Sequence, residues 1–337
     1  MDNARKQQGF ILITVLLLIV LIAAVLLEFN YQSRQDLRGT DNYCRQVQAR
    51  HAARAGIELT RALLSQYPDY RDQEGLGRLF NQEMTLPVAA SQCRILVSQE
   101  GGKININKLK TNDHLERQRI DQLLLLIDVL NQKLPSSRRL EYGLVPAIID
   151  WMDADDQITQ LAFVSHANRG AESEYYRRQV PAYPCANQPL DRIDQLLLVR
   201  DITPRLLYHL TEGTPETADT GLADYLTVYG DGKININDAP LPVLRSLSLS
   251  ITEGLARHIV QYRAIRPFAS VDEIRQVPGM TEEIFTAIQE QITVASAEPC
   301  YRVTVTAQAE NASCKVTAIL KQNHSARRLE MVYYQEI

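Results

Sequence analysis

The sequence has 337 residues, of which 36 are Lys or Arg and 40 are Asp or Glu, and its formal net charge is −4. With 45% apolar residues it has the composition of a folded chain of about two domains, not of a disordered one. The absence of a basic excess argues against a general nucleic-acid binder, and the mean hydropathy of −0.21 excludes a protein with many membrane spans.

The first predicted element is a transmembrane helix over residues 10–27, where Thr14 is the only polar position. A helix of this length spans about 27 Å, close to the ~30 Å hydrocarbon core of a bilayer. The run is longer than the apolar core of a secretory signal peptide, and no small-residue cleavage site follows it. Because Arg5 and Lys6 precede the run, we expect a cytoplasmic N-terminus. The chain after Glu28 would then lie on the opposite side of the membrane.

Gly9 lies between a short basic leader and the apolar run, and this junction resembles the class III leader of type IV pilins and type II secretion pseudopilins. The resemblance implies that a prepilin peptidase cleaves between Gly9 and Phe10 and that Phe10 is then methylated. Most members of that family have a glutamate fifth in the mature chain, whereas this sequence has Thr14 there, as in the K-type minor pseudopilins. On Gly9 alone, a plain signal-anchor helix is an equally good interpretation, because short motifs often occur by chance.

A helix is predicted to continue from Glu28 to about Gln66 and to end at Pro68. Gly39 is expected to bend or melt it locally. Small residues in its second half would let it pack closely on a sheet: Ala49, Ala52, Ala53, Ala55 and Gly56. An apolar stalk that continues into an amphipathic helix is the arrangement of the first helix of pilins.

Two internal repeats indicate that the rest of the chain contains a duplicated helical unit. The hexapeptide Gly-Lys-Ile-Asn-Ile-Asn occurs at residues 102–107 and again at residues 232–237. A second pair relates residues 189–203 to residues 267–281. More residues separate the hexapeptide from the second repeated segment in the first copy than in the second. The first copy therefore carries an insertion, which includes the acidic stretch 150–156.

The second copy resembles a helix-hairpin-helix module, with Ser270 as a predicted helix N-cap. In DNA-binding relatives of this module, glycine-rich hairpins present backbone N–H groups to phosphate, but the first hairpin here, residues 246–250, has no glycine. Five arginines and seven acidic residues between Asp238 and Ile292 give the unit a net negative charge, the opposite of what phosphate binding needs. A helical packing domain is the favoured interpretation, and a membrane-anchored protein for DNA binding and uptake is the alternative.

The full order of elements resembles the K-type minor pseudopilin family of type II secretion systems. Besides the leader, the resemblance rests on Asp-Trp-Met-Asp-Ala-Asp at residues 150–155, Glu-Ser-Glu-Tyr-Tyr at residues 172–176, and the second hexapeptide. It implies an α+β fold: a type IV pilin-like frame, with a long N-terminal helix packed on an antiparallel sheet, and a large inserted all-α domain. The expected segments are a leader at 1–9, a transmembrane helix at 10–27, the first helix and strands at 28–107, the inserted α-domain at 108–228, the helix-hairpin-helix-like unit at 229–295, and C-terminal strands at 296–337.

Alternating apolar and polar residues predict the strands of this sheet. The expected strands are 94–97, 104–106, 301–307, 315–320 and 331–334, with a polar turn at Asn311. Five cysteines, Cys44, Cys93, Cys185, Cys300 and Cys314, leave at least one thiol outside any intramolecular disulfide. Because Cys300 and Cys314 would differ in register across the turn, no direct bridge is expected between them.

The acidic motifs form a candidate calcium site. Calcium takes six to eight oxygen ligands, and carboxylates at alternate loop positions, such as Asp153 and Asp155, converge readily on one ion. Glu172 and Glu174 could complete the shell, and the family resemblance implies calcium in this region. The alternative is a solvated acidic loop, since the glycine and terminal glutamate of an EF-hand are missing.

The sequence carries no catalytic pattern, because its six histidines are dispersed and neither a Gly-x-Ser-x-Gly motif nor a phosphate-binding loop occurs. We therefore do not expect an enzyme. The resemblance implies a single-pass inner-membrane protein with a periplasmic bulk, whose partners are other minor pseudopilins, the prepilin peptidase and the inner-membrane secretion platform. It would cap or initiate the pseudopilus tip and support protein export across the outer membrane. A related pilus machine that uses a K-like subunit is a second setting compatible with the sequence.

Overall fold

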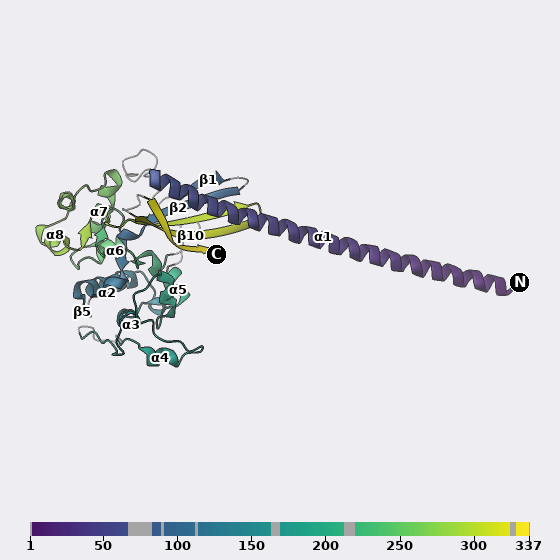
Figure 1. Cartoon of the computed structure of the whole chain (residues 1–337), viewed down its shortest axis with the longest axis horizontal. Helices are drawn as coiled ribbons and strands as arrows, with labels where there is room; N and C mark the ends of the chain where they lie inside the picture. The colour runs from purple at the N-terminus through teal and green to yellow at the C-terminus, as the bar shows by residue number, and fades with distance from the viewer. Residues whose placement is uncertain are drawn as a thin grey trace.

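The computed structural model describes residues 2–66, 83–88, 91–111, 114–162, 169–211, 220–323 and 328–336, with side chains described from residue 15 onward. One long helix, α1 (Asp2–Gln66), extends far beyond a body made of a sheet and a helical domain (Figure 1). This is the predicted α+β class. The predicted bend at Gly39 is wrong: α1 is helical throughout, and open space surrounds this glycine.

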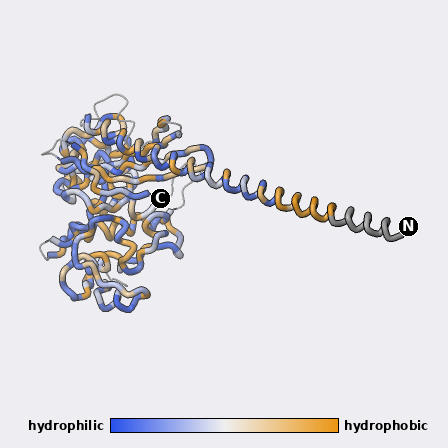
Figure 2. Tube along the Cα trace, turned by 45° about the vertical axis from the view of Figure 1, so that its right-hand side comes forward, coloured by the Kyte–Doolittle hydropathy of each residue, from blue (hydrophilic) through white to orange (hydrophobic). Residues whose placement is uncertain are grey.

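The first part of α1 is uncovered by the body. Side chains from Val15 to Leu27 are exposed and apolar, and Figure 2 shows them as an apolar band on the protruding helix. Among the described residues, α1 is the helix long and apolar enough to cross a bilayer. This is compatible with a single-pass membrane anchor. Pro68, the predicted end of the helix, lies outside the described residues.

The body is built around a five-stranded antiparallel sheet in the order β1-β2-β9-β10-β11. Its strands are β1 (Met84–Val88), β2 (Ser91–Gln99), β9 (Cys300–Ala309), β10 (Ala312–Asn323) and β11 (Arg328–Glu336). Four of the five predicted strands lie within these elements, and the predicted turn at Asn311 joins β9 to β10. The fifth, at residues 104–106, is outside this sheet: β3 (Ile104–Asn105) instead pairs with the helical domain.

The second half of α1 packs on one face of this sheet. Ala49, Ala52 and Ala53 are buried against it, as predicted, whereas Ala55 points to solvent. Gly56 allows the closest approach, because a Cβ there would lie 2.9 Å from a methyl group of Val305. The small residues therefore set the distance between helix and sheet, and the buried strand residues of the same face complete this core.

The cysteines do not cross-link this frame. All five are free thiols. In the ladder between β9 and β10, Cys300 lies opposite Lys321 and Cys314 lies opposite Ala307, so the two thiols are far out of register. The expectation of no direct bridge between them is confirmed.

The helical domain is inserted between β2 and β9 and has its own large apolar core. Its α-helices are α2 (Arg117–Asn131), α3 (Leu144–Met152), α4 (Ser173–Arg177), α5 (Pro204–Tyr208), α6 (Leu241–Arg245), α7 (Glu253–Ile265) and α8 (Glu282–Ile288). The 3-10 helices are η3 (Glu100–Gly102), η4 (Ile106–Lys108), η5 (Ser136–Arg138), η6 (Ile193–Leu198), η7 (Leu222–Asp224) and η8 (Val271–Gln276), and the short strands are β3, β4 (Lys110–Thr111), β5 (His114–Leu115), β6 (Leu226–Thr227), β7 (Ile234–Asn235) and β8 (Ile292–Thr293).

The two hexapeptides make the same structure. The third and fourth residues of each form a two-residue strand in a parallel pair, β3 with β6 in the first copy and β7 with β8 in the second. In the first copy the side chain of Asn107 donates to the carbonyls of Leu190 and Val228, at 2.8 and 3.2 Å, and accepts from the Leu190 N–H. We call this arrangement the asparagine clamp. It connects the hexapeptide directly to the start of the second repeated segment.

The second copy reproduces the asparagine clamp. Asn237 donates to the carbonyls of Phe268 and Val294, at 3.0 and 3.1 Å, and accepts from the Phe268 N–H at 2.8 Å. The two sequence repeats are therefore parts of one unit. In each copy an asparagine side chain connects them through hydrogen bonds to backbone groups.

The helix starts in the second repeated segment are also duplicated. Thr203 and Thr281 each accept a hydrogen bond from the N–H three residues later, as helix N-caps do. The predicted N-cap role of Ser270 is wrong, since its side chain makes no capping bond. Instead Glu273 accepts from the Ala269 N–H, just as Gln195 does from the N–H of the corresponding residue in the first copy.

One buried ionic group joins the helical domain to the sheet; we call it the Glu100 cluster. The carboxylate of Glu100, at the end of β2, accepts from Lys103 Nζ at 2.7 Å, from Arg302 Nε of β9 at 2.8 Å and from Thr227 Oγ1 of β6 at 2.5 Å. Glu100 is 1% exposed. Burial by itself would raise its pKa, but the charges of Arg302 and Lys103 hold the pKa at about 2.

Candidate metal centre

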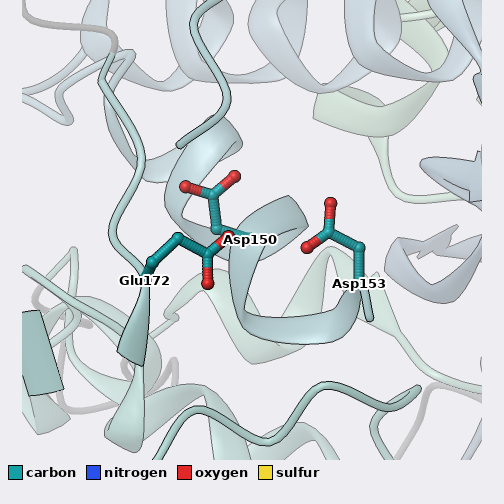
Figure 3. A group of neighbouring side chains, drawn as sticks. All are labelled: Asp150, Asp153 and Glu172. Atoms are coloured by element: carbon teal, nitrogen blue, oxygen red, sulfur yellow. The ribbon is translucent and has the colours of Figure 1, made fainter. Parts of the chain in front are cut away.

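The acidic motif places two carboxylates on one turn of helix. Asp150 lies within α3 and Asp153 follows its last residue, so their spacing of three residues directs both side chains to the same side. Glu172 immediately precedes α4 and faces them. Figure 3 shows the three carboxylates turned toward a common space, with one ligand oxygen of each within 4.8 Å of the others.

The cluster is buried. Asp150, Asp153 and Glu172 are 0%, 7% and 4% exposed. Gly170 closes over Asp150, because a Cβ at this position would lie 2.0 Å from Asp150 Oδ2. Trp151, the residue after Asp150, is also buried and makes edge contacts with Tyr176 and Tyr183. These surroundings separate the carboxylates from water.

Only part of the negative charge is compensated. Lys110 Nζ donates to Asp153 Oδ2 at 2.8 Å, and the Thr159 N–H donates to Asp150 Oδ1 at 2.9 Å. Asp150 Oδ2 and both oxygens of Glu172 have no hydrogen-bond partner in the described part of the chain. Burying unpartnered carboxylates is costly, which makes the group a candidate for a bound cation.

The pKa values reflect the same shortage of positive charge. Burial, followed by the neighbouring charges of Asp150 and Asp153, raises the pKa of Glu172 to about 8. Burial also raises the pKa of Asp150 to about 6, although the hydrogen bond from Thr159 opposes this. A divalent cation among the three side chains would supply the missing charge and keep them ionised.

The predicted ligand set overlaps this cluster in two of its four residues. Asp153 and Glu172 belong to it. Asp155 lies on the exposed loop that follows and accepts from Lys110 Nζ at 3.3 Å and from the Gln157 N–H. Glu174 is exposed and pairs with Arg178, one turn along α4. Sequence reasoning passed over Asp150 as a ligand because it treated the motif as a loop of alternating residues, whereas a helical spacing of three would have indicated it.

The other predicted sites lie elsewhere. The backbone of Gly9 and Phe10 is part of α1, and their side chains lie outside the described residues. The first hairpin, residues 246–250, connects α6 to α7 beside α2 and is described below. The fold therefore keeps the candidate metal site, the processing site and the hairpin in separate regions of the molecule.

The fold and site together define a class of protein. A single apolar N-terminal helix continues onto an antiparallel sheet, and a duplicated helical domain is inserted between two neighbouring strands of that sheet. This is a pilin-like protein with an inserted helical domain.

Family comparison gives the particular identity. Models described as type II secretion system (T2SS), protein K, match residues 102–212 and 234–295, which together make up just over half of the chain. The chain belongs to the type II secretion system protein K family, whose members are minor pseudopilins. The two matched ranges correspond closely to the two copies of the repeated unit.

Individual relatives agree over most of the chain. A type II secretion system protein K from Pseudomonas aeruginosa is 26% identical over 80% of this chain and 76% of its own length. One from Klebsiella pneumoniae is 24% identical, covering 87% and 86%. The crystal structure of the GspK-GspI-GspJ complex from enterotoxigenic Escherichia coli contains a chain of the same fold, with a TM-score of 0.62, 15% identity, and coverage of 90% of this chain and 99% of that one.

Proposed function

We propose that this minor pseudopilin occupies the tip of a type II secretion pseudopilus, where its helical domain ends the filament. The observation that carries the proposal is the placement of that domain. Near the uncovered part of α1, Arg45 pairs with Glu310 in the turn between β9 and β10, whereas β2 leaves the sheet at Gln99, at the opposite end. The helical domain therefore lies at the end of the body away from the N-terminus (Figure 1).

This placement gives the proposal a steric basis. With the apolar part of α1 in the inner membrane and the N-terminus cytoplasmic, the helical domain points away from the membrane. A second subunit stacked above would need the volume that this domain fills. Thr14 adds a second reason. The family resemblance implies that the usual glutamate at this position pairs with the N-terminus of a neighbouring subunit in the filament, and threonine has no carboxylate for that contact.

The partners in this proposal are other minor pseudopilins. Support comes from the structural neighbour, which was solved as a complex of GspK with GspI and GspJ. Cleavage after Gly9, methylation of Phe10, and contact with the inner-membrane secretion platform complete the proposed assembly route. Its outcome would be support of protein export across the outer membrane by a structural, non-enzymatic component.

The test is co-expression of the full chain with the small minor pseudopilins of its own bacterium, followed by isolation of the complex and assembly with the major pseudopilin. We expect a stable complex and gold-labelled antibody against this chain at one filament end only. Label along the filament, or absence of a stable complex, would overturn the tip role. Retention of DNA by the purified chain would favour the alternative of DNA uptake.

A matched variant separates the two reasons for capping. Thr14→Glu restores the carboxylate while leaving the helical domain intact. If the bulk of the domain ends the filament, this variant still labels only the tip. If the missing carboxylate is decisive, the variant enters the filament body.

We further propose that Asp150, Asp153 and Glu172 hold a calcium ion. The buried, partly uncompensated carboxylates support this, and hard carboxylate oxygens are the ligands calcium prefers. We expect Glu172→Gln in the full chain to weaken calcium binding at least about tenfold by calorimetric titration. Asp156→Asn, an exposed neighbour, is the control.

The other predicted ligands provide a direct comparison. Glu174→Gln should leave calcium affinity unchanged, because Glu174 points to solvent and pairs with Arg178. Asp155→Asn should also have little effect, because Asp155 lies on the exposed loop and outside the buried cluster. Equal loss of affinity from Glu174→Gln and Glu172→Gln would show that the buried cluster is not the site.

A further inference from the structure

A groove runs along helix α2 on the surface of the helical domain. One hollow of about 440 Å³ is lined by the first half of α2, together with Ser246 and Leu247. A second hollow of about 480 Å³ is lined by the second half of α2, together with Leu249 and Ile251. Leu125, in the middle of the helix, lines both, so the two hollows adjoin. We call this the α2 groove, and its other wall is the α6–α7 hairpin.

The shape of the groove suits an extended chain. α2 has 15 residues and is therefore about 22 Å long. An extended polypeptide advances about 3.3 Å per residue, so about six to seven residues would lie along it. The centre is apolar, with Leu125 and Val129 on one side and Leu249 on the other. Leu249 is 84% exposed at the hairpin tip, so its apolar side chain is accessible to a segment lying in the groove.

Positive charge is concentrated at one end. Arg139 and Arg245 line the second hollow. Arg139 is exposed, and no carboxylate of the described chain pairs with it. The Glu253 carboxylate forms ion pairs with Arg257 at 2.6 Å, Arg245 at 3.9 Å and Lys133 at 4.0 Å, so one negative charge is shared among three cations. Asp128 is the carboxylate that lines this hollow, and the two arginines outnumber it. This end is therefore complementary to an acidic group.

We propose that the α2 groove is a docking site for an extended segment of another polypeptide, with apolar side chains over Leu125 and Leu249 and an acidic side chain at Arg139. Such a segment would exclude water from Leu249 and supply the negative charge that Arg139 lacks. The groove lies in the helical domain, at the end of the body away from the N-terminus of α1 (Figure 1), so a partner would reach it without displacing the sheet or the apolar helix.

The test uses the full chain in detergent micelles and fluorescence anisotropy. The probe is a fluorescein-labelled, C-terminally amidated hexapeptide of two aspartates followed by alternating leucine and alanine, together with its reversed sequence. We expect saturable binding of one of the two. Leu249→Asp and Arg139→Glu should each weaken it at least about tenfold, and neither should unfold the chain because both side chains are exposed.

Three controls make the result specific. Ile265→Asp changes a side chain that is 90% exposed at the end of α7, outside the groove, and should leave binding unchanged. Empty micelles measure partition of the probe into detergent. A probe with lysines in place of the aspartates should bind Arg139→Glu better than the unaltered chain.

Two results would overturn the proposal: no saturable binding of either acidic probe up to about 1 mM, or an equal loss from Ile265→Asp and Leu249→Asp. The assay contains no other pseudopilin. Failure here therefore leaves the tip role untouched, and failure of the tip role leaves the groove untouched.

Discussion

The two copies of the repeated unit share an asparagine clamp but differ in what surrounds it. In the first copy, Glu100 precedes the hexapeptide and its Lys103 is buried in the Glu100 cluster. In the second copy, Gly230 stands at the position corresponding to Glu100, and Lys233 is exposed. The same six residues therefore fold alike in both places, and a difference outside the shared contacts, Glu100 in place of Gly230, gives the first copy its buried ionic contact with the sheet.

The comparison also locates the specialised chemistry. The acidic residues of the candidate metal centre lie in the insertion of the first copy, between its hexapeptide and its second repeated segment. The α2 groove uses both copies, since α2 belongs to the first and the α6–α7 hairpin to the second. The duplicated contacts provide a scaffold, while the differences between copies provide the sites.

Removing the charge specific to the first copy should have the largest effect. Glu100→Ala leaves the buried Lys103 and the partly buried Arg302 without their carboxylate, which typically costs about 3–5 kcal/mol. Urea unfolding of the full chain measures this loss. Lys233→Met removes the exposed charge that corresponds to Lys103 in the second copy, and it should alter the free energy of unfolding by less than about 0.5 kcal/mol. Similar losses from both variants would contradict the assigned role of the Glu100 cluster.

Acid should weaken the same contact. The pKa of Glu100 is about 2 in the folded chain, below its value of about 4.3 when unfolded. A lowered folded pKa means that the carboxylate stabilises the fold fully above the unfolded value and loses this contribution as pH falls from about 5 to about 2. The expected contribution is about 3 kcal/mol. Comparing the pH dependence of the native chain with that of Glu100→Gln isolates it; parallel curves would refute it.

Breaking the asparagine clamp should have similar, intermediate effects in the two copies. Asn107→Ala and Asn237→Ala each remove two hydrogen bonds to backbone carbonyls and one from a backbone N–H, and we expect a loss of about 2–3 kcal/mol from each. Hydrogen exchange should localise the damage. Asn107→Ala should expose amides near residues 189–199, and Asn237→Ala amides near residues 267–277. A loss confined to the second copy in both variants would show that the two clamps are not equivalent.

The helix caps should give the smallest difference. Thr203→Ala and Thr281→Ala each remove one N-cap hydrogen bond, at a cost of about 1 kcal/mol. Since the two caps have the same geometry, their effects on thermal unfolding should agree within about 0.5 kcal/mol. A large difference would mean that the insertion in the first copy changes how its helices are supported.

Much of the fold could be predicted because its signals are local. The length of the apolar run indicates α1, alternation indicates β2, β9, β10 and β11, and exact repetition indicates the duplicated unit. Local signals also explain the errors. Gly39 has a low helix propensity, but a single glycine within so long a helix does not interrupt it.

The remaining features depend on residues that are distant in sequence. Glu100 contacts Arg302, which lies 202 positions later in the sequence, and no periodic pattern in the sequence predicts that contact. The asparagine clamp connects two repeats that look unrelated when read separately. At the candidate metal centre, the residue types were recognisable, but the choice between Asp150 and Asp155 depends on where α3 ends, which is the least predictable property of a helix.

The uncovered stretch of α1 also determines how far the sheet lies from the membrane. Between the apolar run, which ends at Leu27, and Arg45, where the sheet first contacts the helix, 17 residues of polar helix are bare. At 1.5 Å per residue, this stretch is about 25 Å long. With the apolar run in a bilayer and the helix upright, the sheet stands clear of the lipid headgroups by roughly the width of a small domain. Part of a neighbouring subunit could therefore fit between the sheet and the bilayer surface. Deleting residues from this stretch would shorten the gap.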